Sequence, residues 1–287
     1  MSIAIVILLG IIQGAFMFIP VSSTAHLVLT QHWLISQGAD LPAPDSPEMI
    51  LFDLLVHVGT LFSIIIVFRR SLLRLSCSIL AGLKQLLARP SPLPLALRLA
   101  LLLALSVIAT GVIGITFKLF FEAIFARPQW VAFTLALTGV LLWVSDKLPP
   151  RPKGLKDLRP STALIIGAAQ GLALIPGISR SGITITAALF TGMKRRWAAE
   201  YSFFLAIPTI LAATLVQAIE VYSADTSELR LGWVEMGVGM LVAAVVGTLA
   251  LYLVVRLLKK AQLRIFSWYL WFLSGLVILG FLPFTSF

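Results

Sequence analysis

The sequence predicts an all-α, polytopic membrane protein with six transmembrane helices and two re-entrant helical hairpins arranged as an inverted repeat. The first of three supporting observations is composition: 59% of the 287 residues are hydrophobic and 12% are charged, whereas soluble domains carry about 25% charged residues. A soluble globule of this composition would lack the polar surface to cover its core. Composition therefore excludes a soluble enzyme and a disordered chain, and the single cysteine, Cys77, excludes a disulfide scaffold.

The second observation is a set of continuous apolar runs, each close to the ~20 residues that a membrane-spanning helix needs. Six runs are predicted to be full spans: 49–68, 95–117, 129–145, 201–219, 233–255 and 265–286. These runs make the chain a multi-pass membrane protein.

The third observation is a pair of apolar segments, 3–35 and 161–192, that are interrupted half-way by proline and a serine-rich run. The interruption PVSST begins at Pro20, and the interruption PGISRS begins at Pro176. Each segment is predicted to form two half-helices. Irregular backbone at membrane depth is tolerated only where it is buried in protein or lines a wet cavity, so both interruptions are expected inside the protein.

Basic residues predict the orientation. Most of the 22 Lys and Arg residues fall in four stretches, 69–89, 147–159, 194–196 and 256–264, and such an excess is typical of cytoplasmic loops. The loop 37–48 contains no basic residue and is assigned outside. This assignment places the basic stretches on the inner face of the membrane.

The same assignment fixes how the interrupted segments enter the membrane. Segment 161–192 lies between two basic stretches, so it enters and leaves from inside, whereas 3–35 ends in the outside loop and no basic residue precedes Arg69. The first segment is therefore expected to enter from outside. Counting the spans then places both termini outside. The net charge of +10 belongs to the inner loops, so no nucleic-acid partner is expected.

An internal repeat supports this layout. The sequence GIIQG begins at Gly10 and GAAQG begins at Gly167, each a short distance before the proline of its interruption. Residues 1–287 are interpreted as a single membrane domain of two repeats, 1–145 and 161–287, each an interrupted hairpin followed by three spans. Because three is odd, the repeats are expected to be inverted, as in many transporters.

The interruptions have the composition of an anion site. Serine and threonine are preferred where a helix begins, and a helix N-terminus offers unpaired N–H groups and a positive dipole end. Arg180 is the only basic residue predicted deep in an apolar segment; burying it costs at least ~2.5–3.5 kcal/mol on insertion scales. Its guanidinium can donate two parallel hydrogen bonds to a phosphate or a carboxylate. The alternative is a structural ion pair with Asp53 or Glu200.

Two further groups of polar residues have helical spacing. His26 follows Ser22 by four residues and Ser23 by three, so the three share a helix face. They could supply a nucleophile and a base, or form only structural hydrogen bonds. Asp53 and His57, also four apart, could bond each other, ligate a cation, or form a satisfied buried pair. Glu200 is interpreted as a carboxylate at the membrane boundary, with a metal or Arg180 as the alternative partner.

At the two interruptions the sequence resembles the undecaprenyl-diphosphate phosphatase family of the bacitracin-resistance type. The resemblance covers nearly the whole chain, and its most specific part is the run PGISRSGIT from Pro176. The other matching stretches are QG at Gln13 with IPVSSTAH from Ile19, FD at Phe52 with HVGT from His57, and AEYSFFLAIP from Ala199.

The resemblance implies an integral membrane enzyme that removes one phosphate from the C55 polyprenyl diphosphate and recycles this lipid carrier for cell-wall synthesis. It also implies a divalent metal, Mg²⁺ or Ca²⁺, and an active site open to the external face; it gives no oligomeric state. The residues that fall on the family's site are expected to be catalytic Ser23, His26 and Arg180, substrate-binding Gln13, Ser22, Thr24, Ser179, Ser181 and Thr184, and metal-binding Asp53 and Glu200.

One departure concerns the first motif. The family places two acidic positions four residues apart there, with glutamine sometimes allowed at the first, whereas this chain has Gln13 and Met17. Methionine is a poor ligand for a hard cation, which takes oxygen ligands. Either the remaining oxygen donors suffice, or turnover is slow, or the chain is a non-catalytic relative. Two other functions remain open, a transporter or flippase for a phosphorylated lipid or small anion, and a structural membrane subunit.

Overall fold

The computed structural model describes residues 1–43, 46–89, 92–125, 128–223 and 232–279, without the side chains of 118–125, 128–129 and 220–223. The described part is helical, apart from one isolated bridge between Lys153 and Met193. Its helices are α1 (Ile3–Phe18), α2 (Ser23–Ser36), α3 (Pro47–Ala88), α4 (Leu95–Phe125), α5 (Pro128–Lys147), η1 (Leu155–Asp157), α6 (Pro160–Leu172), α7 (Arg180–Phe190), α8 (Arg195–Ser223), α9 (Trp233–Lys259) and α10 (Arg264–Ile278).

The all-α membrane class is confirmed. Among the described residues, the helices long and apolar enough to cross a membrane are α3, α4, α5, α8 and α9, which contain the first five predicted spans. The sixth, 265–286, is described only as the 15-residue α10, because residues 280–287 lie outside the described part. A sixth full span therefore stays a prediction.

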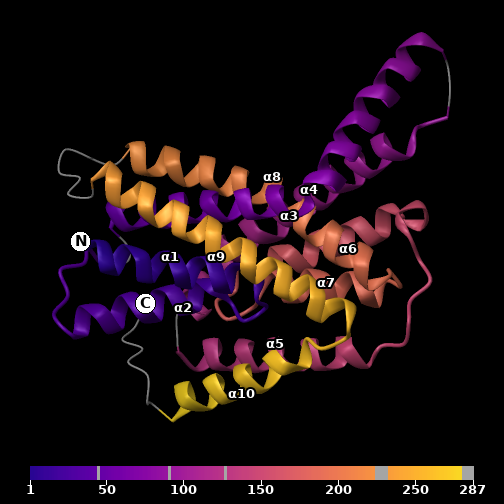
Figure 1. The fold of residues 1–287 in the computed structure, drawn as a ribbon. Coiled ribbons are helices and arrows are strands. Elements are labelled where there is room, and N and C mark those ends of the chain that lie inside the picture. The colour runs from indigo at the N-terminus through magenta and orange to yellow at the C-terminus, as the bar shows by residue number, and fades with distance from the viewer. Residues whose placement is uncertain (44–45, 90–91, 126–127, 224–231, 280–287) are drawn as a thin grey trace.

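The basic stretch after the first span is helix, not loop. The interpretation of 69–89 as a loop was wrong, because α3 continues unbroken for 42 residues to Ala88. This stretch is rich in leucine and arginine, which favour helix, and the helix ends just before Pro90, whose ring disfavours helical backbone in the preceding residue. We call residues 69–88 of α3, together with 92–98, which lead into α4, the arm, which projects beyond the other helices (Figure 1).

Both interrupted segments form helical hairpins, as predicted. The first consists of α1 and α2, joined by residues 19–22, and the second of α6 and α7, joined by residues 173–179. They enter the helical bundle from opposite ends and turn back near its middle (Figure 1). We call the two connections the first tip (19–22) and the second tip (173–179).

Each hairpin packs against a helix of the other half of the chain: α1 against α9, and α6 against α4. Glycines allow the close approach: a Cβ at Gly10 would lie 2.9 Å from the Gly239 carbonyl oxygen, and one at Gly167, the corresponding glycine of the second repeat, would lie 2.3 Å from that of Ser106. Small residues serve this purpose between membrane helices. The glycines of the two sequence repeats thus make equivalent contacts, which supports the predicted inverted repeat.

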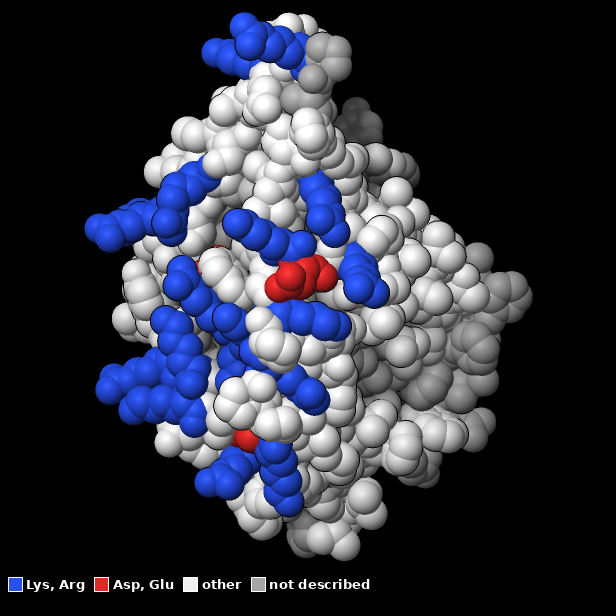
Figure 2. Space-filling view, turned by 90° about the vertical axis from the view of Figure 1, so that its right-hand side faces the viewer, with Lys and Arg blue, Asp and Glu red and all other residues white. Residues whose placement is uncertain are grey.

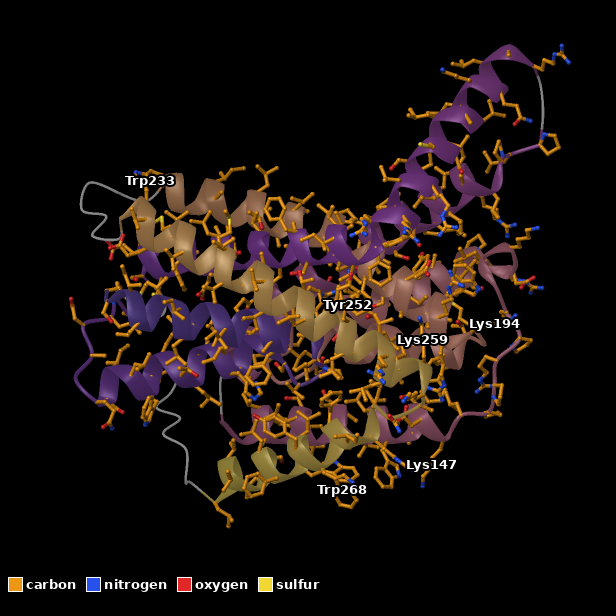
Figure 3. The ribbon with its side chains drawn as sticks, in the orientation of Figure 1. Lys147, Lys194, Trp233, Tyr252, Lys259 and Trp268 are labelled. Carbon is orange, nitrogen blue, oxygen red and sulfur yellow. The ribbon has the colours of Figure 1, made fainter. Side chains whose placement is uncertain are left out.

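Basic side chains gather at one end of the bundle, the right-hand end of Figure 1 (Figure 2). Lys147, Lys194 and Lys259 lie toward this end, and Trp233 lies at the other (Figure 3). The second hairpin enters from the basic end and the first from the opposite one. This is the relation that the charge pattern predicts, with the basic end as the inner face.

Candidate active site

The two tips meet in the interior. The Ser181 hydroxyl, in the first turn of α7, donates to the carbonyl of Phe18 at the end of α1 (3.3 Å). A Cβ at Gly182 would lie 3.4 Å from Cβ of Pro20, and Phe18 packs edge-on against Phe203 of α8 (centroids 5.9 Å apart). The start of α7 is therefore in contact with the first tip, as the sequence predicts.

The first tip contains a strained residue. Ser22 has φ 70° and is not a glycine, and a residue in this region costs of order 1–3 kcal/mol. The Ser22 side chain makes no capping bond to α2, and its carbonyl accepts instead from Nδ1 of His26 (2.8 Å). Such strain is typical of functional sites.

His26 is held from two sides. Because Nδ1 donates to the Ser22 carbonyl, Nε2 of the neutral imidazole is left to accept from the hydroxyl of Tyr269 on α10 (2.6 Å). The two rings are stacked with centroids 5.6 Å apart. Tyr269 was missed by sequence reasoning, because it is 243 residues away from His26 and no local pattern links the two positions.

Met17 lies between two of the predicted site residues. Its sulfur accepts from Nε2 of Gln13 (3.6 Å) and from the hydroxyl of Ser23 (3.8 Å). In the described part of the chain, Oε1 of Gln13 is buried without a hydrogen-bond partner. The thioether of Met17 thus accepts from two donors, and the Gln13 amide oxygen is left unpaired among the described residues.

The second tip is fixed by threonines of α5. Thr134 donates to the Pro176 carbonyl (2.5 Å), while Thr138 donates to the Gly177 carbonyl (3.2 Å) and accepts from the Ser179 N–H (3.3 Å). Gly177 has φ +89°, and a Cβ there would lie 2.3 Å from Oγ1 of Thr134. Only glycine fits this turn. Like Tyr269, Thr134 and Thr138 have no signal in the sequence.

Arg180 begins α7 directly after this turn. Both terminal guanidinium nitrogens are buried, and neither has a hydrogen-bond partner in the described part of the chain. The alternative ion pairs with Asp53 and Glu200 do not form: Asp53 accepts from Nε2 of Gln31 (3.3 Å), and Glu200 pairs with Arg196 (3.2 Å). A buried cation of this kind needs an anion.

The hydroxyls around Arg180 make mainly structural bonds. Ser179 caps α7 by accepting from the Gly182 N–H (3.2 Å). Thr184 bonds the Arg180 carbonyl (2.8 Å) and the hydroxyl of Ser202 (2.6 Å). On the first hairpin, Ser23 is half-buried and Thr24 is exposed. Substrate contacts by these residues stay predictions.

Asp53 and His57 do not pair through their side chains. His57 Nδ1 donates to the Asp53 backbone carbonyl (2.7 Å), while the Asp53 carboxylate bonds Gln31. These bonds make a polar link between α3 and α2.

Glu200 lies elsewhere. It shares a pocket wall with Ser71 and Arg74 at the root of the arm. Ser71 is 18 residues beyond Asp53 on the same helix, which is about 27 Å of α-helix. The two carboxylates predicted to share a metal are therefore not brought together.

The chain matches a known protein family over most of its length. Residues 6–276 match a family model described as bacitracin resistance protein BacA. The chain belongs to the BacA family. The match spans both hairpins and the helices that follow them, so the site described above lies within it.

Relatives of this chain in the BacA family match it over nearly its whole length. The chain is 56% identical over 276 residues to a protein named undecaprenyl-diphosphatase from Alkalilimnicola ehrlichii, covering 96% of this chain and 95% of that one. A protein of the same name from Halorhodospira halophila is 54% identical over 285 residues, covering 98% and 99%. A third, from Halothermothrix orenii, is 37% identical over 279 residues, covering 97% and 98%.

Proposed function

We propose that this protein hydrolyses undecaprenyl diphosphate to undecaprenyl phosphate and phosphate, and so recycles the lipid carrier of cell-wall synthesis. The observation that carries the proposal is that the two terminal nitrogens of Arg180 are buried, without a hydrogen-bond partner among the described residues, beside the contact between the two tips. A phosphate group supplies the anion that this cation lacks. The names of the whole-length relatives point to the same substrate.

The chain's own residues suit such a reaction. Arg180 and the N-terminal N–H groups of α7 would hold the terminal phosphate and neutralise charge that develops on it. Either Ser23 or a water molecule attacks the terminal phosphorus, the bond to the bridging oxygen breaks, and the lipid phosphate leaves. Attack by Ser23 would form a phosphoserine that water then hydrolyses.

His26 is the proposed proton acceptor. Both of its nitrogens are engaged, Nδ1 with Ser22 and Nε2 with Tyr269, and the Ser23 hydroxyl bonds Met17. To act as a base, His26 therefore exchanges its bond to Tyr269 for a bond to the nucleophile. Nδ1 remains anchored, so the ring keeps its orientation during the exchange.

A divalent metal, Mg²⁺ or Ca²⁺, is poorly matched by the chain alone. These ions take oxygen ligands, yet the described residues hold no group of three or more His, Cys, Asp and Glu that could bind a metal, and Met17 offers sulfur. The residues therefore do not fit a protein-held metal, and no step above depends on one. We propose that any such cation would take most of its oxygen ligands from the diphosphate.

The topology is also a proposal. With the basic end inside the cell, the first hairpin enters from outside and the second from inside, as inverted repeats of one membrane domain in the bacterial inner membrane. Both termini then lie outside. Labelling of single cysteines placed in the 37–48 loop and in 147–159, in a Cys77→Ser background, tests this orientation in intact cells.

The test of the function is phosphate release from undecaprenyl diphosphate by the purified protein, with Mg²⁺ or Ca²⁺ supplied. Arg180→Ala should lower turnover by about 10²–10³-fold, the usual loss when one preorganised charge is removed, and should keep the melting temperature. Arg70→Ala, an exposed arginine of the arm, is the control and should be unaffected. Wild-type turnover in Arg180→Ala would refute the role of Arg180.

The second candidate is a transporter or flippase for a phosphorylated polyprenyl lipid. The observation that favours it is Met17, which replaces an acidic residue of the family's first motif by a thioether. Binding or translocation of the lipid without phosphate release, in the same preparation, would support this candidate and refute the hydrolase.

A further inference from the structure

A pocket lined by both basic and apolar side chains lies at the basic end, away from the two tips. It is an open pocket of about 500 Å³ between the arm and α8. Arg74 on its wall lies 17 residues beyond His57 along α3, or about 25 Å of helix. The function proposed above makes no use of this pocket.

Part of the pocket lining is polar and basic. Arg74 and Gln85 come from the arm, and Arg196 comes from the first turn of α8. No Asp or Glu occurs between residues 54 and 121, so the arm adds positive charge only. The single acidic residue on the wall, Glu200, is already paired with Arg196.

Arg196 has guanidinium nitrogens that its ion pair does not use. Its Nε donates to Glu200 (3.2 Å), and its two terminal nitrogens lie outside that ion pair. The guanidinium lies over the ring of Trp197, 4.7 Å from the centroid, and the side chain is 57% exposed. A guanidinium oriented in this way suits an oxyanion, above all phosphate.

Another part of the pocket lining is apolar and belongs to the membrane-spanning helices. Leu99, Leu103 and Phe204 line it, and they lie within the apolar stretches of α4 and α8. A soluble anion would gain nothing from this wall, whereas a hydrocarbon chain would be buried against it. The pocket thus has basic side chains in one part of its lining and apolar side chains in another.

From this pairing we propose that the pocket is a binding site for one phosphate-headed membrane lipid, with the headgroup at Arg74 and Arg196 and the chain against Leu103 and Phe204. The site is separate from the one at the tips. Lipid binding in this pocket requires neither hydrolysis nor transport, so the proposal can be tested independently of the proposed function.

The test is native mass spectrometry of the full-length protein in detergent, titrated with phosphatidylglycerol, undecaprenyl phosphate or inorganic phosphate, with phosphatidylcholine as the reference lipid. Arg74→Gln removes a charge from the pocket lining, and Arg70→Gln removes one from an exposed residue one turn earlier that does not line the pocket. Ala81→Trp fills the pocket, and Leu80→Trp places the same side chain on the outer face, where Leu80 is 61% exposed.

The proposal expects one tightly held anionic lipid in the wild type. Arg74→Gln should weaken its binding about fivefold, the usual effect of one basic residue near a phosphate-headed lipid surface, and Ala81→Trp should abolish it. Arg70→Gln and Leu80→Trp should change it less than twofold. A preference for undecaprenyl phosphate over phosphatidylglycerol, or the reverse, would identify the lipid.

Three results would overturn the proposal. Equal losses in Arg74→Gln and Arg70→Gln would mean that the arm attracts anionic lipid only through its general charge. Undiminished binding in Ala81→Trp would place the lipid outside the pocket. Binding of inorganic phosphate as tight as that of the lipids would mean that the apolar wall contributes nothing.

Discussion

The two tips are built alike but have different chemistry. Counted from the proline, the fourth residue is Thr24 in the first hairpin and Arg180 in the second, and the sixth is His26 in the first and Gly182 in the second. The cation and the imidazole therefore occupy different positions of the repeat. Gly182 has no side chain and faces Pro20 of the first tip. The position that holds an imidazole in the first hairpin is therefore empty in the second, and the two tips can approach each other there.

The tips are also stabilised differently. The second makes three hydrogen bonds with Thr134 and Thr138 of α5, and its positive φ falls on a glycine. In the first, the positive φ falls on Ser22, and the link to the neighbouring helix α10 runs through His26 to Tyr269. The second tip is a rigid holder for a charge, whereas the first stores strain beside the group that we propose moves a proton.

The largest expected effect on this comparison comes from His26→Ala. If the first tip supplies the proton acceptor, turnover should fall by about 10²–10⁴-fold, while binding of the diphosphate, which depends on Arg180, should change little. Phosphate release and lipid binding are measured on the same preparation. Ser36→Ala, in the exposed last turn of α2, is the control, and near-normal turnover in His26→Ala would show that the first tip is only structural.

Stability should separate the tips next. Gly177→Ala forces a positive φ on alanine and a Cβ against Thr134, so it should destabilise the protein by about 2–4 kcal/mol. Ser22→Gly relieves strain but adds backbone entropy to the unfolded chain, so the net change should be within about 1 kcal/mol.

Melting in detergent measures both variants. Gly111→Ala is the matched control, since nothing lies within 4 Å of a Cβ at Gly111, and it should be neutral or slightly stabilising. Equal melting temperatures for Gly177→Ala and Gly111→Ala would contradict the rigid account of the second tip.

Met17→Glu tests the departure in the first hairpin. A carboxylate in place of the sulfur would accept from Gln13 and Ser23 with charge-assisted bonds and would add an oxygen ligand for a divalent cation. We expect phosphate release to rise severalfold and to saturate at a lower Mg²⁺ or Ca²⁺ concentration. Met17→Gln, which adds no charge, is the control; no gain in Met17→Glu over this control would mean that the site works without the missing acid.

Much of the architecture could be predicted from the sequence, because a membrane restricts what an apolar run can become. The interrupted segments, their entry from opposite ends and the buried Arg180 follow from prolines, charges and apolar lengths. The arm could not be predicted in this way: positive charge after a span marks a side of the membrane, but it does not distinguish a loop from a helix that continues past the apolar run.

The candidate site could be predicted only in part. Serines, His26 and Arg180 are visible because they interrupt apolar sequence, whereas Thr134, Thr138 and Tyr269 lie within ordinary spans and act through tertiary contacts. Asp53 and Glu200 were grouped by residue type, and the structure separates them because α3 carries its residues along the full thickness of the bundle. Chemistry can be read locally, but the pairing of distant side chains requires the fold.

The smallest expected effect concerns how α10 supports the first tip. Tyr269→Phe removes the hydroxyl bonded to His26 Nε2 but keeps the stacked ring, and Nδ1 stays anchored to Ser22. The proposed reaction requires His26 to give up this bond, so removing one hydrogen bond of about 0.5–1.5 kcal/mol should raise kcat by about two- to tenfold at most and leave KM unchanged. A lower kcat would mean that the bond positions the ring during the reaction. Tyr252→Phe, on the exposed face of α9, is the control, and a rise in KM without loss of kcat would instead make Tyr269 a substrate contact.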